Sequence, residues 1–62
     1  MPNIQVEILK GRTVEQKRDM VRKVTDVIVE TLNCSREVVR IVINEMEPEN
    51  FGKAGILKID SQ

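Results

Sequence analysis

The segment VVRIVINEM, residues 38–46, decides the fold of this chain. Its apolar residues occupy both alternating sets of positions: Val38, Val39, Ile41, Val42, Ile43 and Met46. A strand that is apolar on both faces is normally covered by protein on both sides. The sequence therefore predicts a strand over residues 38–46 that is buried on each face.

A second strand is predicted upstream, over residues 3–9, NIQVEIL. Ile4, Val6 and Ile8 alternate with polar residues, which is the period-two pattern of a strand with one buried face. If the strand is regular from its first residue, Pro2 faces the same side as these three residues. Gly11 then supplies a turn.

A helix is predicted over residues 13–32. Thr13 and Gln16 form a capping-box pattern, and Asn33 is a plausible terminator. Apolar residues follow at three- and four-residue steps, as in an amphipathic helix: Met20, Val21, Val24, Val27, Ile28 and Leu32.

The order strand, helix, strand predicts a parallel pair joined by a right-handed crossover. One helix covers only one face of a two-stranded sheet, so the other face of residues 38–46 needs a second copy of the chain. The tail KAGILKID, residues 53–60, is expected to form a small hairpin or arm. We therefore predict a single α+β domain over residues 1–62, built as one β-α-β unit and assembled into an oligomer.

Composition narrows the function classes. The 62 residues hold ten basic and ten acidic side chains, no histidine and one cysteine, Cys34. This argues against an internal disulfide, a metal site or a nucleic-acid-binding surface. No apolar run approaches the roughly 18 residues of a membrane span, and no signal peptide is evident, so cytoplasmic location is expected. Cys34 is interpreted as a small, part-buried residue near a helix end.

Pro2 has a structural and a chemical interpretation. Proline is tolerated as the first residue of a strand. If Met1 is removed, however, Pro2 carries a free secondary amine. Desolvation and nearby cations lower the pKa of such an amine, which makes it a general base without histidine. The spacing alone leaves both interpretations open.

Two arginines and one aromatic residue are candidates for binding an acidic substrate. Arg12 follows Gly11, and Arg40 interrupts an apolar strand, where a cation needs solvent, an acidic partner or an anionic ligand. Arginine fits a carboxylate with two hydrogen bonds. Phe51, the only aromatic residue, lines a pocket or belongs to the core.

Four stretches resemble the 4-oxalocrotonate tautomerase family: Met-Pro-x-Ile-x-Val-x-Ile-Leu-x-Gly-Arg, Thr-x-Glu-Gln-Lys, Val-Arg-Ile-Val-Ile and Asn-Phe-Gly. The resemblance covers essentially the whole chain. It implies a β-α-β protomer that assembles into homohexamers, as trimers of dimers.

The resemblance also implies roles for individual residues. Pro2 is the general base, and Arg12 binds a substrate carboxylate. Arg40 reaches a neighbouring active site and stabilises charge on the 2-position oxygen. Phe51 is an apolar wall that helps to keep the pKa of the prolyl amine low. Leu9 and Met46 match pocket-lining positions more loosely.

The function implied is an isomerase that moves a proton in 2-hydroxydienoates such as 2-hydroxymuconate, without cofactor or metal. Two alternatives stay open. The first is a promiscuous member of the same family with an unknown substrate, including hydratase or dehalogenase chemistry. Such chemistry would need extra acidic or aromatic pocket residues, for which only Glu7 and Glu45 are candidates. A self-assembling binding module would have no catalytic proline at all.

Overall fold

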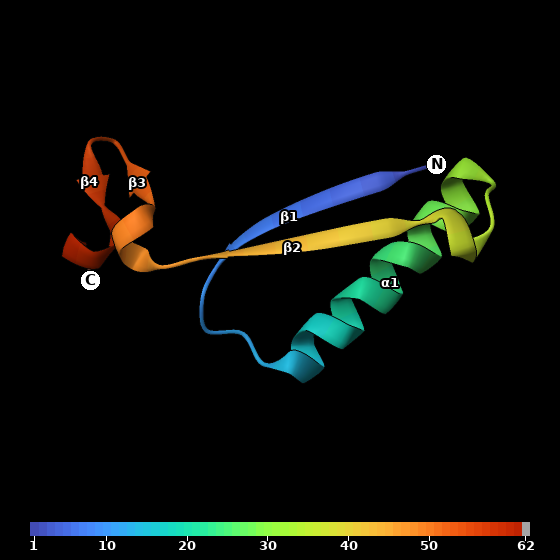
Figure 1. The fold of residues 1–62 in the computed structure, drawn as a ribbon, viewed down its shortest axis with the longest axis horizontal. Coiled ribbons are helices and arrows are strands. Elements are labelled where there is room, and N and C mark those ends of the chain that lie inside the picture. The colour runs from blue at the N-terminus through green and yellow to red at the C-terminus, as the bar shows by residue number, and fades with distance from the viewer. Residues whose placement is uncertain (62) are drawn as a thin grey trace.

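The computed structural model describes residues 1–61. Strand β1 (Asn3–Leu9), helix α1 (Val14–Leu32) and strand β2 (Arg40–Met46) form a β-α-β unit (Figure 1). Strands β3 (Gly52–Lys53) and β4 (Ile56–Leu57) form a small C-terminal hairpin. Three 3₁₀ turns join or end these elements: Arg36–Val38, Pro48–Asn50 and Lys58–Asp60. The predicted architecture is confirmed.

Strands β1 and β2 are parallel, as predicted, with Asn3 opposite Arg40 and Leu9 opposite Met46. Two backbone hydrogen bonds extend the pairing past both ends of β1. The Arg40 N–H donates to the Pro2 carbonyl oxygen at 3.1 Å, and the Lys10 N–H donates to the Met46 carbonyl oxygen at 2.9 Å. The chain is therefore held to the sheet from Pro2 to Lys10.

Strand β2 starts two residues later than predicted. The N–H of Val38 donates to the Ser35 carbonyl oxygen at 3.3 Å, and the N–H of Val39 donates to that of Arg36 at 3.2 Å. These bonds close a 3₁₀ turn. Both valines therefore precede the strand, and their side chains belong to neither face of the sheet. Arg40 consequently opens β2 and does not interrupt an apolar run.

Helix α1 has the predicted ends. The Gln16 N–H donates to the Thr13 hydroxyl oxygen at 3.1 Å, and the Thr13 N–H donates to the Gln16 side-chain oxygen at 2.9 Å. This is the reciprocal capping box. Asn33 ends the helix in the left-handed conformation, at φ 55° and ψ 56°.

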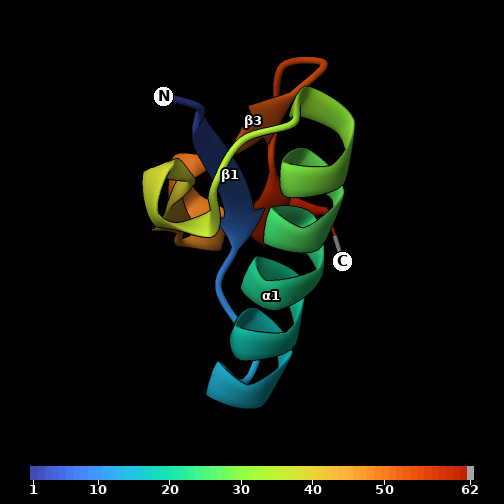
Figure 2. The same ribbon diagram turned by 90° about the vertical axis from the view of Figure 1, so that its right-hand side faces the viewer.

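Only one face of the sheet is covered by α1 (Figure 2). The alternate strand residues on that face are half-buried: Ile4, Val6, Ile8, Ile41 and Ile43. The other face is open, and Val42 there is 51% exposed. On β2 this face also carries Arg40 and Asn44, so only the face of β2 that α1 covers is packed within one chain.

The described part of the chain has no fully buried side chain. No helix within residues 1–61 is both long enough and apolar enough to span a membrane.

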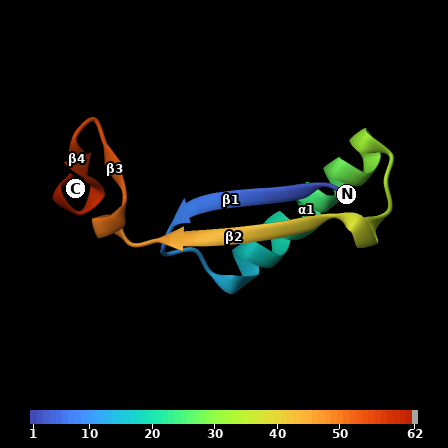
Figure 3. The same ribbon diagram turned by 45° about the horizontal axis from the view of Figure 1, so that its top comes forward.

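The C-terminal hairpin lies beyond the end of the sheet, at the opposite end of the long axis from the N-terminus (Figures 1 and 3). Its two-residue turn consists of Ala54 and Gly55, with φ values of 54° and 80°. Positive φ at both positions is typical of the tight turn that joins twisted strands. The Lys58 N–H donates to the Phe51 carbonyl oxygen at 2.8 Å and closes the hairpin beside Phe51.

Candidate active site

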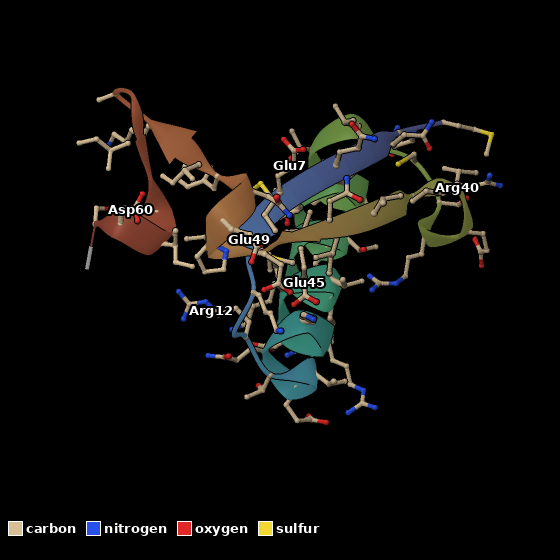
Figure 4. All side chains as sticks on the ribbon, turned by 60° about the vertical axis from the view of Figure 1, so that its left-hand side comes forward. Glu7, Arg12, Arg40, Glu45, Glu49 and Asp60 are labelled. Carbon is tan, nitrogen blue, oxygen red and sulfur yellow. The ribbon has the colours of Figure 1, made fainter. Side chains whose placement is uncertain are left out.

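The predicted site residues form two groups at opposite ends of the sheet. Pro2 and Arg40 lie where the strands begin, whereas Leu9, Arg12 and Phe51 lie where they end. Strand β1 has seven residues, which at about 3.3 Å per residue separate its two ends by about 20 Å. Figure 4 shows Arg12 and Arg40 at these separate places. One chain therefore does not bring all five residues together.

Pro2 is half-buried and prolongs β1, because its carbonyl oxygen accepts the bond from the Arg40 N–H. Its nitrogen is a peptide nitrogen in the chain that begins at Met1. Met1, on the other side of the peptide bond to Pro2, is 75% exposed to solvent. Removal of Met1 leaves a secondary amine at the edge of the sheet.

Arg40 is exposed and lies opposite Asn3, at the first pair of the parallel register. Side chains alternate along a strand, so Arg40 and Asn3 share the open face, whereas Pro2 belongs to the face that α1 covers. Within residues 1–61 the Arg40 guanidinium has no acidic partner. The Arg40 side chain therefore points away from the proline of its own chain.

At the other end of the sheet, Leu9 and Phe51 line one cavity of about 420 Å³. Both residues were predicted to line a pocket, and the fold brings them together from opposite halves of the chain. Five further lining residues were not singled out there: Lys53, Ala54, Ile56, Lys58 and Ser61. The available signal was the pair of lysines that flank the short apolar tail.

Arg12 is exposed and lines a neighbouring hollow of about 530 Å³ together with Leu9, which belongs to both spaces. Gly11 has a φ of 132°, which side chains other than glycine rarely adopt. This conformation turns the chain out of β1 and places Arg12 at the end of the sheet. In the described residues Arg12 also has no acidic partner.

The acidic candidates lie away from Pro2. Glu45 points to the helix side, where its carboxylate lies 2.5 Å from the Lys17 ammonium. Glu7 is on the open face opposite Asn44. Neither residue is placed as a proton donor beside the proline of its own chain.

Two further residues that the sequence drew attention to, Met46 and Cys34, lie outside the lining of the cavity that Leu9 and Phe51 share. Met46 pairs with Leu9 but does not line the cavity. Cys34 follows the helix C-cap, is half-buried and forms no disulfide. Residues 1–61 contain no cluster of three or more histidine, cysteine or acidic side chains that would hold a metal ion.

A family model, a curated relative and a solved structure that match this chain are all described as tautomerases or probable tautomerases. Residues 2–60 match the family model described as "Tautomerase enzyme". A probable tautomerase from Staphylococcus aureus (strain Mu50) is 40% identical over 60 residues, which cover 97% of this chain and 98% of that protein. A solved 4-oxalocrotonate tautomerase isozyme from Methylibium petroleiphilum is 46% identical, with a TM-score of 0.91 over 94% of this chain and 91% of its own.

The fold also extends to a more distant protein. A heterohexamer 4-oxalocrotonate tautomerase from Chloroflexus aurantiacus J-10-fl is 24% identical and superimposes over the whole of both chains with a TM-score of 0.92. The match of the family model to residues 2–60, together with the 40% identity over 60 residues, shows that this chain belongs to the tautomerase family.

Proposed function

We propose that this protein is a tautomerase in which Pro2, freed by removal of Met1, is the general base. The observation that carries the proposal is the position of Pro2. The Pro2 carbonyl oxygen accepts a 3.1 Å hydrogen bond from the Arg40 N–H, which prolongs the pairing of β1 with β2. Because the backbone of Pro2 is held in this way, its ring nitrogen has a fixed direction. Contact with apolar groups and arginines lowers the pKa of such an amine, and the neutral form then accepts a proton near neutral pH.

The proposed reaction is a proton shuttle in a 2-hydroxydienoate such as 2-hydroxymuconate. The nitrogen of Pro2 takes the proton of the enol hydroxyl, and the electron pair of that O–H bond forms the carbonyl. The conjugated double bonds shift, and the prolinium returns the proton to carbon. The product is the conjugated 2-oxo acid, and no external oxidant or reductant is needed.

The two arginines are proposed to divide the remaining work. Arg40 stabilises the negative charge that develops on the 2-position oxygen, and Arg12 anchors the distal carboxylate. Their lack of acidic partners within residues 1–61 supports this division, since both guanidiniums are free to bind an anion.

This division predicts different kinetic effects for the two alanine variants. Arg40→Ala lowers kcat, because it removes an interaction that strengthens in the transition state. Arg12→Ala mainly raises KM, because it removes substrate binding. Steady-state kinetics of both variants checks this, and the reverse pattern would mean that the roles are exchanged.

The separation of the two groups of residues supports a site shared between chains. The chain exposes 5084 Å², whereas a folded monomer of 7.1 kDa is expected to expose about 4,100 Å². The excess, about 1,000 Å², is close to the roughly 800 Å² that each partner contributes to a standard interface. We therefore propose a homo-oligomer, and the family resemblance leads us to propose that it is a hexamer built as a trimer of dimers.

The test is the rate of 2-hydroxymuconate ketonisation, followed by ultraviolet absorbance, on protein shown by intact mass to begin at Pro2. A kcat/KM of about 10⁶ M⁻¹s⁻¹ is expected for a dedicated enzyme. Pro2→Ala should lose most of this rate, and the rate of the intact site should fall at acid pH as the amine becomes protonated. A rate at solvent background, or full activity of Pro2→Ala, would contradict the proposal and favour a non-catalytic module.

A further inference from the structure

Two lysines, Lys53 and Lys58, are among the basic side chains that have no acidic partner within residues 1–61. Within residues 1–61, six of the ten basic side chains form ion pairs: Lys10, Lys17, Arg18, Arg22, Lys23 and Arg36. The four without an acidic partner are Arg12, Arg40, Lys53 and Lys58. The two lysines therefore share a property with the two arginines of the proposed site.

Lys53 and Lys58 also share a place. Both line the 420 Å³ cavity with Leu9 and Phe51, and no acidic residue of the described chain lines it. A cavity of this size lies within the range of about 300–1,000 Å³ that is typical of small-molecule sites. Its surface combines an apolar wall with two positive charges, which is suited to an apolar molecule that carries an anionic end.

The backbone of the hairpin holds both lysines at the cavity. Lys53 pairs with Ile56 on either side of the Ala54–Gly55 turn. Lys58 is tied to Phe51 by the 2.8 Å backbone hydrogen bond. The positions of the two lysine backbones relative to Phe51 are therefore fixed, while the ammonium groups remain able to follow a bound anion on their flexible stems.

We propose that Lys53 and Lys58 determine substrate specificity by charge, favouring dianionic over monoanionic 2-hydroxydienoates. The apolar body of the substrate lies against Leu9 and Phe51, and the lysines attract the carboxylate remote from the reacting oxygen. Arg12, in the adjoining hollow across Leu9, receives the same carboxylate. This inference rests on the proposed function of the site.

The test compares a double variant, Lys53→Met with Lys58→Met, against a charge-preserving control, Lys53→Arg with Lys58→Arg. Methionine keeps an unbranched apolar stem and removes the charge. The two substrates are 2-hydroxymuconate and the corresponding monoacid that lacks the distal carboxylate. An exposed charge pair contributes up to about 1 kcal/mol, or about fivefold. The two factors multiply to at most about 25-fold, so a change in KM of roughly tenfold is expected when neither lysine contributes the maximum.

The expected result is a KM about tenfold higher for the diacid in the methionine variant, with kcat and the monoacid kinetics little changed. The arginine control should keep the wild-type preference, and added salt should weaken it in the wild type. Equal changes for diacid and monoacid would overturn the proposal. Dissociation of the oligomer in size-exclusion chromatography would also overturn it, since the lysines would then hold neighbouring chains together.

A binding measurement separates this inference from the proposed function. Muconate is a diacid without an enol, and sorbate is a related monoacid, so neither is a substrate for the proton transfer. Isothermal titration calorimetry should show that wild-type protein prefers muconate and that the methionine variant loses this preference. If the wild type binds muconate selectively yet does not turn over 2-hydroxymuconate, the proposed function fails while the role of the lysines stands. If it binds both acids equally, the lysine proposal fails.

Discussion

Mixed oligomers provide the sharpest test of the shared site. Pro2 and Arg12 lie beyond opposite ends of β1, and the seven residues of this strand separate its two ends by about 20 Å. Because the two residues lie at opposite ends of the sheet, we infer that a substrate that touches both lies between two chains. We predict that Pro2→Ala and Arg12→Ala chains, each of which has a low kcat/KM alone, restore activity in each other when they assemble together.

The rate that is restored follows from the fraction of sites that receive both intact residues. In a random one-to-one mixture of Pro2→Ala and Arg12→Ala chains, half of the sites receive an intact Pro2. If Arg12 comes from a different chain, half of those sites also receive an intact Arg12, so about a quarter of the sites are complete in a symmetric assembly. If both residues came from one chain, no site would be complete.

The assay is to unfold and refold the two variants together and to measure 2-hydroxymuconate ketonisation at substrate concentrations far below KM. About 25% of the wild-type rate is expected, while each variant alone stays near its own residual rate. As a matched control, wild-type chains are refolded with the doubly substituted chain, which lacks both residues. If Pro2 and Arg12 of one site come from different chains, this mixture should have about a quarter of the wild-type rate. If they come from the same chain, it should have about half, so a value near half would refute the reasoning.

Three further predictions concern stability. The half-exposed pair of Lys17 and Glu45 joins α1 to β2, and a double-mutant cycle with Lys17→Met and Glu45→Gln should give a coupling free energy of about 1 kcal/mol in urea unfolding; a value near zero would contradict this. Ala54 adopts a φ of 54°, so Ala54→Asn should stabilise the hairpin by about 0.5–1 kcal/mol and raise Tm at fixed protein concentration; a lower Tm would count against it. The hydrogen bond from Lys23 lowers the pKa of the Asp19 carboxyl, so the stability it contributes is present above about pH 4 and is lost as the pH falls through the folded-state pKa. Asp19→Asn should therefore lower Tm slightly at pH 7 but not at pH 2, and a pH-independent difference would argue against the ion pair.

Much of the local structure was predictable because it depends on neighbours in the chain. The alternation of Ile4, Val6 and Ile8 marks β1, and the reciprocal hydrogen bonds of Thr13 and Gln16 start α1 as expected. These signals need no tertiary contact, because a strand repeats every two residues and a helix cap spans only three. The family resemblance, carried by short motifs over the whole chain, was likewise readable and is confirmed by the comparisons.

The start of β2 was not predictable from the same kind of pattern. Val38 and Val39 have the apolar, β-branched character of strand residues, yet the 3₁₀ turn before Arg40 takes their N–H groups out of the sheet. The backbone pairing with Pro2 decides where the strand begins, and this pairing joins residues that are 38 positions apart.

The sequence by itself determined the elements, their order and the residue types that suit proton transfer on an acidic substrate. Only the tertiary structure decided that Pro2 and Arg12 lie at opposite ends of one sheet, and that Lys53 and Lys58 line a cavity with Leu9 and Phe51. The physical reason is the separation, along the chain, of the residues that interact. Periodicity and capping report contacts within a few residues, whereas the site depends on the direction of two parallel strands and on a hairpin closed by the bond between Lys58 and Phe51.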